Sequence, residues 1–144
     1  MSGRCTRTAP TLGEQHMNST IAARLYAALT TYVVLFQIAL AAGMPWGELA
    51  WGGSHPGTLP RQLRIASGAS AAVLLALAFV VLVRAGLLLQ SWKHRTRQLI
   101  WVAVGYGALG VVANAITPSS WERIVWLPVT ILLLVASLIV ARSP

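Results

Sequence analysis

This chain of 144 residues contains only three acidic residues and one cysteine. Because Cys5 stands alone, the chain cannot form an internal disulfide, a CxxC redox pair or a cysteine-based metal site. The three histidines are isolated from one another and lie outside the long apolar runs, so neither zinc ligation nor haem ligation within a helix bundle is supported. We therefore expect no metal and no other cofactor.

The acidic residues, Glu14, Glu48 and Glu122, lie at or beyond the ends of the apolar runs, whereas eleven Lys and Arg residues give a net charge of +8. Nucleic-acid binding would need basic residues clustered on one face of a soluble domain. Here they stand in the gaps between apolar runs, where they set the orientation of membrane helices. We expect a lipid bilayer, and no nucleic acid, as the partner.

Hydrophobic residues make up 56% of the chain, charged residues make up 10%, and the mean hydropathy is +0.68. A helix needs about 20 mostly apolar residues to cross a bilayer. Four segments meet this need, at about 21–42, 63–89, 99–116 and 120–141. The predicted fold class is all-α, a membrane-embedded bundle of four transmembrane helices within residues 21–144, preceded by a flexible tail over residues 1–20.

Eight of the eleven basic residues lie on the side that holds both termini and the connection after the second helix. Connections in the cytoplasm carry the excess of positive charge, so we expect both termini in the cytoplasm of a bacterial cell (inner) membrane, as a multi-pass protein. Two alternatives remain open. The first helix could be a signal peptide cleaved after Ala39-Leu40-Ala41, and Met17 could be the true start.

The outer connection, residues 43–62, has about 20 residues, more than the roughly two to eight usual between helices. Its glycines and prolines predict a compact cap, formed by Pro45–Pro60 with Thr117–Trp126, over the mouth of the bundle. The tryptophans fit an interfacial belt, and the outer ones could also wall a pocket. The candidate binding residues of the cap are Trp46, Glu48, Trp51, His55, Arg61, Arg64, Trp121, Glu122 and Arg123.

Structural roles compete with binding for two of these residues. Glu48 could form an ion pair with Arg61, Arg64 or Arg123 and so fix the loop. Ser119-x-x-Glu122 has the pattern of a capping box, in which each side chain satisfies the backbone N–H of the other residue.

A stripe of small residues, formed by Ala103, Gly107, Gly110 and Asn114, follows helical spacing along the third helix. Small residues let a neighbouring backbone approach closely, so the stripe is expected to face another helix. We expect Asn114 to meet Gln37 and Ser67 in an intramembrane polar layer, because polar groups in hydrocarbon are costly unless paired. The layer could be structural, or it could form the floor of a small ligand cavity.

The inner connection Ser91–Gln98 is basic, and we expect it to touch anionic lipid head groups, with binding of a partner as the alternative. Arg84 is expected to reach those head groups from a helix that continues to about Gln90.

Two segments, P-W-G-E-L-A-W-G-G-S-H-P-G-T-L-P and N-A-I-T-P-S-S-W-E-R-I-V-W-L-P, resemble those of small, uncharacterised four-helix integral membrane proteins of high-GC actinobacteria. This resemblance implies a membrane bundle from the first helix onward and carries over no activity and no site residues. The chain is also similar in size to small four-helix drug exporters, but it has no acidic residue in the middle of a span to couple proton exchange.

The first hypothesis is a non-enzymatic membrane protein whose outer cap binds a partner protein or an amphipathic small molecule. The alternative is a small transporter or transporter subunit, with Gln37, Ser67 and Asn114 lining a path. The third is an outer-leaflet enzyme that uses Glu48 or Glu122 as acid or base with His55. A further partner considered is another membrane protein or a second copy of the chain.

Overall fold

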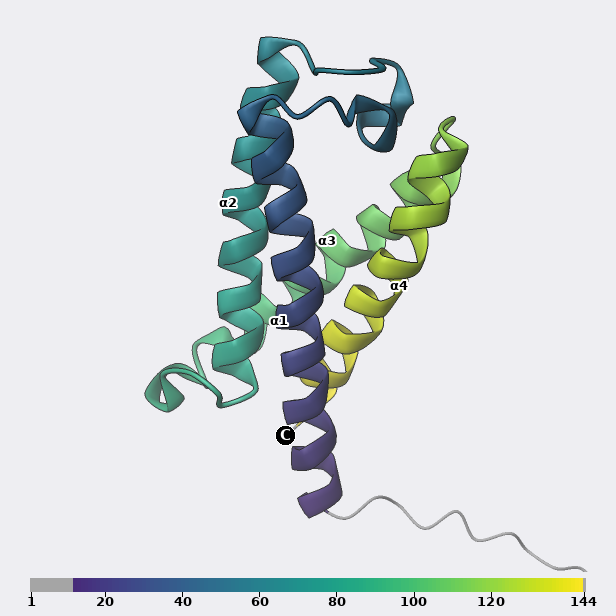
Figure 1. Cartoon of the computed structure of the whole chain (residues 1–144). Helices are drawn as coiled ribbons and strands as arrows, with labels where there is room; N and C mark the ends of the chain where they lie inside the picture. Colours follow the sequence, from purple (N-terminus) through teal and green to yellow (C-terminus); the bar gives the residue numbers. More distant parts are fainter. Residues whose placement is uncertain (1–11, 144) are drawn as a thin grey trace, which may run out of the picture.

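The computed structural model describes residues 12–143, and over that range the chain is all-α (Figure 1). Residues 1–11, with Cys5 and the start of the expected tail, lie outside the described residues. The elements are α1 (Leu12–Ala42), η1 (Gly47–Leu49), η2 (Trp51–Gly53), α2 (Arg61–Arg84), η3 (Gln90–Trp92), α3 (Thr96–Ile116) and α4 (Ser120–Arg142), where η marks a single 3-10 turn.

All four α-helices are long and apolar enough to cross a membrane, in agreement with the expected fold class. Their outer faces carry large apolar side chains that no other part of residues 12–143 covers. Leu109 and Ile116 on α3 are 70% and 75% exposed, and Ile124 on α4 is 66% exposed. Continuous apolar surface of this extent is unfavourable in water and favourable in hydrocarbon, so the fold suits a multi-pass membrane protein.

The helix α1 begins at Leu12, well before Ile21, so the expectation of a flexible tail is wrong for residues 12–20. That stretch is polar, and hydropathy therefore gave no sign of a helix. It contains no proline and several residues of good helix propensity, and Ser19 is buried against the bundle.

The helix α2 ends at Arg84 rather than near Gln90, because Gly86 has a φ of +75° that terminates it. The N–H groups of Gly86 and Leu87 turn back to carbonyls of the last helical turn, which is the Schellman arrangement. Arg84 is consequently enclosed by protein rather than extended toward head groups, and its guanidinium donates to the carbonyl of Ser143 at the end of α4.

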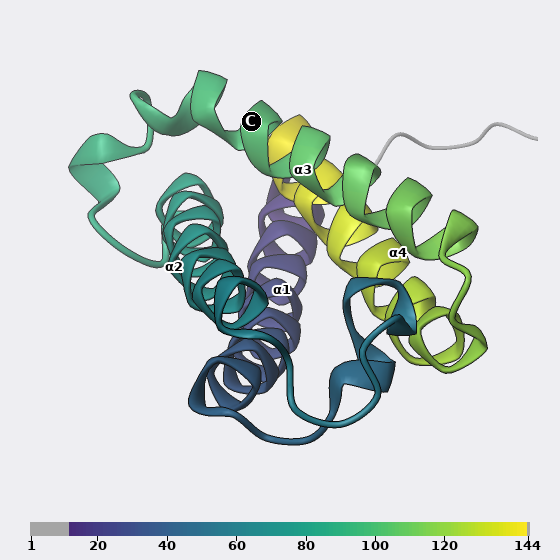
Figure 2. The same cartoon turned by 90° about the horizontal axis from the view of Figure 1, so that it is seen from above.

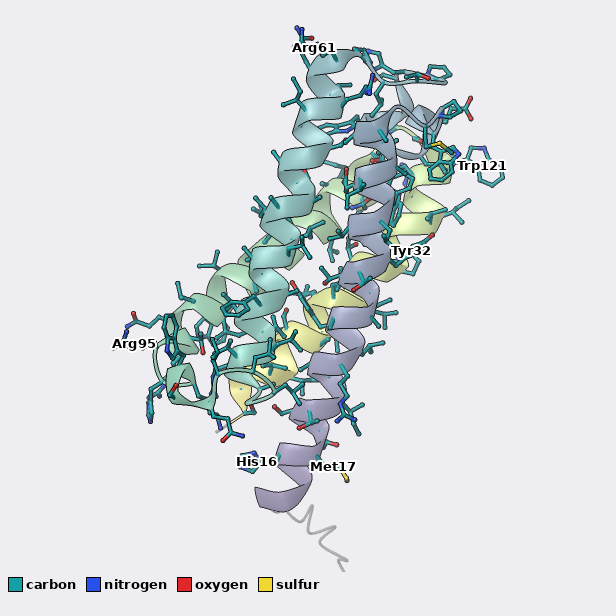
Figure 3. All side chains as sticks on the ribbon, turned by 60° about the vertical axis from the view of Figure 1, so that its left-hand side comes forward. His16, Met17, Tyr32, Arg61, Arg95 and Trp121 are labelled. Carbon is teal, nitrogen blue, oxygen red and sulfur yellow. The ribbon has the colours of Figure 1, made fainter. Side chains whose placement is uncertain are left out.

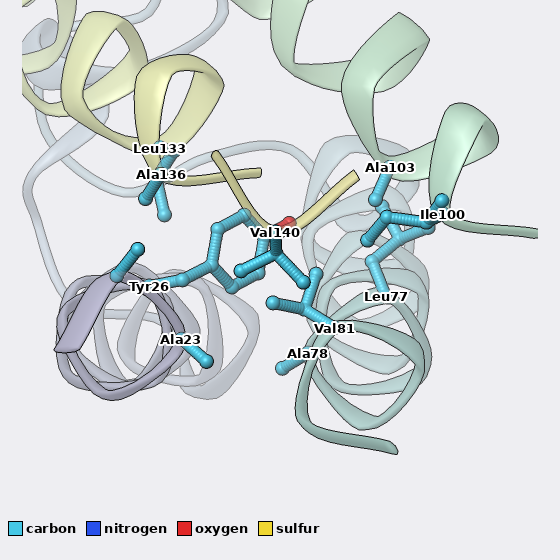
Figure 4. Close-up of a cluster of buried hydrophobic side chains, with 11 residues drawn as sticks. Ala23, Tyr26, Leu77, Ala78, Val81, Ile100, Ala103, Leu133, Ala136 and Val140 are labelled. Atoms are coloured by element: carbon cyan, nitrogen blue, oxygen red, sulfur yellow. The ribbon is translucent and has the colours of Figure 1, made fainter. Parts of the chain in front are cut away.

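The helices pack as two antiparallel pairs, α1 with α2 and α3 with α4, and α1 also packs along α4. The second pair is inclined to the first, so the helices converge near the C-terminus and spread toward the outer connection (Figures 1 and 2). Where they converge, all four contribute to one apolar cluster (Figure 4), which includes Tyr26, Leu77, Val81, Ile100, Ala103, Leu133 and Val140. Where they spread, the buried cluster draws on α1, the outer connection and α4, through Phe36, Leu40, Ala50, Leu59 and Trp126.

The stripe of small residues on α3 faces α4, as the sequence predicted. Ala103 is fully buried, and a methyl group on Gly107 would lie 3.4 Å from Cα of Leu134. A methyl group on Gly110 would lie 3.4 Å from Cγ2 of Thr130. Close approach of the two backbones therefore depends on these glycines.

Candidate functional site

The outer connection folds into two turns, η1 and η2, that extend from α1 and α2 toward α4 (Figures 1 and 2). We use "cap" for residues 45–60, which contain these turns. The N–H of Gly47 donates to the carbonyl of Gly57 at 2.9 Å and joins the two halves of the cap. A Cβ on Gly47 would lie 2.0 Å from the carbonyl oxygen of His55, so only glycine fits there.

Trp51 has a left-handed backbone conformation, with a φ of +54°, and Gly52 and Gly53 follow with φ of +76° and +68°. That conformation is costly for a bulky residue, and such residues often mark a functional constraint. The indole Nε1–H of Trp51 donates to the hydroxyl of Ser67 at 3.1 Å, and Ser67 is fully buried on α2. The strained residue thus connects the cap to α2.

Three hydrogen bonds connect the cap to the start of α4. The N–H of Gly52 donates to Oε2 of Glu122 at 2.9 Å. The hydroxyl of Ser119 donates to the carbonyl of Glu48 at 2.9 Å. The indole of Trp126 donates to the carbonyl of Leu49 at 2.7 Å. The cap therefore bridges α2 and α4 at the end where the helices spread.

Glu122 confirms one half of the expected capping box. Its N–H donates to the hydroxyl of Ser119 at 3.2 Å, as the pattern predicts. Its carboxylate does not follow the pattern, because Oε2 accepts from the N–H of Gly52 and, at 2.6 Å, from the hydroxyl of Thr117. The carboxylate therefore joins the two outer connections, a role that local sequence spacing cannot indicate.

Two of the candidate arginines, Arg64 of α2 and Arg123 of α4, donate to helix ends instead of forming the expected ion pair with Glu48. Nε of Arg64 donates to the carbonyl of Ala41 at 3.0 Å, at the end of α1. Nη2 of Arg123 donates to the carbonyl of Thr117 at 2.6 Å, at the end of α3. Cations are favourable at helix C-termini, where carbonyl groups lack partners. The third candidate partner, Arg61, is exposed at the start of α2 (Figure 3).

The expected polar layer does not form as a set of mutual hydrogen bonds. Ser67 accepts from Trp51, and Nδ2 of Asn114 donates to the carbonyl of Gly110 in its own helix at 2.8 Å. Oε1 of Gln37 is buried and has no hydrogen-bond partner. Gln37 and Asn114 nevertheless line the same cavity.

This cavity has a volume of about 640 Å³ and lies between the spread helix pairs, against the cap. Its walls come from all four helices and are mainly apolar, with Val33, Phe36, Leu74, Leu109 and Leu133 among them. Its polar lining includes the side chains of Gln37, Trp51, Ser70, Asn114, Thr117 and Glu122.

Of the nine predicted cap residues, Trp51 and Glu122 line the cavity. Trp46 stacks on Phe36 with ring centroids 6.0 Å apart, and Trp121 is 65% exposed and points outward (Figure 3). His55 is exposed, and its Nδ1 lies 3.0 Å from the hydroxyl of Ser54. Among residues 12–143, no three His, Cys, Asp or Glu side chains come together in a way that could hold a metal ion.

Four residues of this site are absent from the nine candidates, although two of them, Thr117 and Trp126, bound the second segment of the predicted cap. Trp126 is buried, packs on Phe36 with ring centroids 4.6 Å apart, and anchors the cap. Thr117 bonds the carboxylate of Glu122 and lines the cavity. Phe36 and Tyr106 line it as well. Tyr106 lies one helical turn before Gly110 of the small-residue stripe, and this spacing could have indicated that its side chain lies near that stripe.

Comparison of the chain with known protein families, curated proteins and solved structures finds no match, so the site rests on its own geometry.

Proposed function

We propose that this chain is a multi-pass protein of a bacterial cell membrane, with cytoplasmic termini, whose cap and underlying cavity bind an amphipathic small molecule. The observation that carries the proposal is the cavity of about 640 Å³, with apolar walls and polar groups near the cap. Small-molecule sites commonly have volumes of roughly 300–1,000 Å³, apolar linings and a few polar groups. The cap residues Gly52 and Trp51 border the cavity and belong to the site rather than to a separate surface.

The position of the cavity favours a ligand that arrives from the bilayer. Leu74 of α2 and Leu109 of α3 both line it, and Leu109 is largely exposed on the outside of the bundle. A molecule dissolved in the hydrocarbon can therefore approach between α2 and α3 without crossing the cap. Its apolar chain would replace lipid contacts with the walls, at little cost in hydrophobic free energy.

The polar lining favours a head group that carries N–H or O–H donors. Oε1 of Gln37 is a buried acceptor without a partner, which is costly until a donor reaches it. The carboxylate of Glu122 is a second acceptor on the lining, and it carries negative charge. An alkyl ammonium or a long-chain alcohol can donate a hydrogen bond to either acceptor, whereas an ionised carboxylate head group can donate to neither.

The alternative of a transport path has weaker support. Gln37 and Asn114 line the cavity as a path would require, but the inner end of the bundle is closed. Val81, Ile100 and Val140 are fully buried in the apolar cluster there. The enzyme alternative loses support because the carboxylate of Glu122 already holds two structural hydrogen bonds, and His55 does not line the cavity.

A pair of alanines on α3 provides the test. Ala113 and Ala115 are both exposed, but Ala113 lines the cavity and Ala115 does not. We expect Ala113→Phe to fill the cavity and Ala115→Phe to add apolar area toward lipid only. The probe is dodecylammonium brominated on its terminal carbon, titrated into the full chain in phosphatidylcholine nanodiscs, with quenching of tryptophan fluorescence as the signal.

The proposal predicts saturable quenching that Ala113→Phe weakens at least about tenfold in dissociation constant, or about 1.4 kcal/mol, and that Ala115→Phe leaves unchanged. Brominated dodecanoate should quench far less than the ammonium probe. Equal quenching in both variants, or equal quenching by both probes, would show partitioning into lipid without a site and would contradict the proposal.

A further inference from the structure

Among the described residues, the cavity beneath the cap has one charged side chain on its lining, the carboxylate of Glu122. Its Oε2 accepts from the N–H of Gly52 and the hydroxyl of Thr117, neither of which is charged, and Glu122 has no ion-pair partner among residues 12–143. The next residue, Arg123, donates to the carbonyl of Thr117 and does not line the cavity. The carboxylate therefore borders an apolar cavity that has no cation on its described lining.

Most of the hydrogen-bond donors on the lining are already used within the protein. The indoles of Trp51 and Trp126 donate to the hydroxyl of Ser67 and the carbonyl of Leu49. Four further lining side chains also donate to protein acceptors: Ser70, Asn114, Thr117 and Thr130. By contrast, Oε1 of Gln37 is an acceptor without a partner. A positive group in the cavity therefore meets open acceptors, whereas a negative group meets few free donors.

Aromatic side chains contribute much of the wall. Two of them lie close to Glu122: Trp126 follows it by four residues on the same face of α4, and Trp51 precedes Gly52, whose N–H is bonded to the carboxylate. A cation is attracted to the face of an aromatic ring, most strongly where water is excluded. The aromatic residues of the lining are Tyr26, Phe36, Trp51, Tyr106 and Trp126.

We propose that the cavity selects its ligand by positive charge and takes a lipophilic organic cation, including a quaternary ammonium that has no N–H group. The inference rests on the proposed function and narrows it, because a neutral long-chain alcohol should bind less well than a cation of equal length. Charges interact strongly where water is scarce, so the attraction of Glu122 acts beyond direct contact. The alkyl chain of the same ligand would pack on apolar wall residues such as Val33, Leu74 and Leu133.

Two probes of matched shape separate charge from hydrophobicity. Dodecyltrimethylammonium carries a permanent positive charge, whereas dodecyldimethylamine oxide has an oxygen in place of one methyl group and is used at a pH where it has no net charge. Both are brominated on the terminal carbon and titrated, below solubilising concentrations, into the full chain in phosphatidylcholine nanodiscs. Quenching of tryptophan fluorescence is the signal. Because this lipid has no net charge, a difference between the probes that depends on the variant is due to the protein.

We expect wild type to bind the cation at least about tenfold more tightly than the amine oxide, and Glu122→Gln to remove most of this selectivity. The measured quantity is the ratio of the two dissociation constants, because a loosened cap would weaken both probes alike and leave the ratio unchanged. Tyr106→Leu removes a ring from the wall, leaves the bonds of the cap in place and should lower the ratio about threefold. Its control is Trp101→Leu, an exposed ring on the same helix that does not line the cavity.

A lower ratio in Glu122→Gln or Tyr106→Leu that Trp101→Leu does not share supports the inference. A ratio that neither variant lowers, or that Trp101→Leu lowers equally, would overturn it. Equal binding of the two probes to wild type, with both weakened by Ala113→Phe, would also overturn it and leave the proposed function standing. Quenching by both probes that Ala113→Phe does not weaken would overturn the proposed function, and the inference with it.

Discussion

The N–H of Gly52 donates to Oε2 of Glu122 at 2.9 Å, across 70 positions of the sequence. The same oxygen accepts from the hydroxyl of Thr117, and the neighbouring Trp51 donates to Ser67. One carboxylate and one indole thereby connect α2, the cap and the α3–α4 connection at the end where the helices spread. The cavity keeps its outer wall because these contacts hold the cap in place.

Replacing Glu122 by Gln should loosen the cap. The amide keeps the size of the side chain but removes the negative charge of the group to which Gly52 and Thr117 donate. Hydrogen bonds to charged groups are worth about 1.5–3 kcal/mol. We expect a lower unfolding temperature in detergent and faster proteolysis within residues 45–60. The matched control is Glu48→Gln, whose side chain is exposed and which should change stability by less than about 0.5 kcal/mol. Equal effects of the two substitutions would contradict this role of Glu122.

The bond between Trp51 and Ser67 can be measured by a double-mutant cycle. Trp51→Phe keeps an aromatic ring and removes the indole N–H, and Ser67→Ala removes the acceptor. We expect a coupling free energy of about 0.5–1.5 kcal/mol, because residues that share a hydrogen bond are not additive. Purely additive unfolding free energies would mean that the cap is not connected to α2 in this way.

Gly47→Ala should disrupt the cap without affecting the helices. The added methyl would lie 2.0 Å from the carbonyl of His55 and 2.8 Å from that of Gly57, so the two halves of the cap must separate. We expect a loss of about 1–3 kcal/mol, as for other overpacked sites. Gly105→Ala is the control, since nothing lies within 4 Å of its Cβ position. Hydrogen exchange that stays slow at the backbone N–H of position 47 in the variant would count against the geometry described.

The contact between α3 and α4 depends on Gly107 and can be tested in the same manner. Gly107→Leu would place a large side chain against the backbone of Leu134 and should force the two helices apart, with a marked loss of thermal stability. Gly105→Leu faces open space on the same helix and should be tolerated. If both variants unfold at the wild-type temperature, α3 does not use this stripe to pack.

Hydropathy was sufficient to predict the four helices, because an apolar run long enough to cross a bilayer is expected to form its backbone hydrogen bonds internally, as a helix. It failed at two ends. Residues 12–20 are polar, so the start of α1 gave no apolar signal. Leu87–Leu89 are apolar, so the run appeared to continue past Gly86, where backbone conformation ends α2. Helix ends are set by local backbone bonds, to which hydropathy is insensitive.

The candidate site was predicted less well, because its contacts join residues far apart in the sequence. The capping spacing identified the N–H bond of Glu122 and could not indicate that its carboxylate reaches Gly52. The arginines were expected to pair with Glu48, but Arg64 and Arg123 donate to backbone carbonyls at helix ends. Every residue has a backbone carbonyl, so the sequence does not indicate which of them an arginine will reach. Gln37 and Asn114 were expected to meet, but the structure leaves a cavity that both line rather than a hydrogen bond between them.

The proposed function depends on the cap and the α2–α3 connection lying on opposite faces of a membrane, and cysteine labelling tests this directly. In a Cys5→Ser background, single cysteines replace His55 in the cap or Ser91 in the inner connection, both of which are exposed. A membrane-impermeant maleimide applied to intact bacterial cells should label His55→Cys at once and Ser91→Cys only after the membrane is permeabilised. Labelling of both cysteines from outside, or of Ser91→Cys alone, would contradict the account.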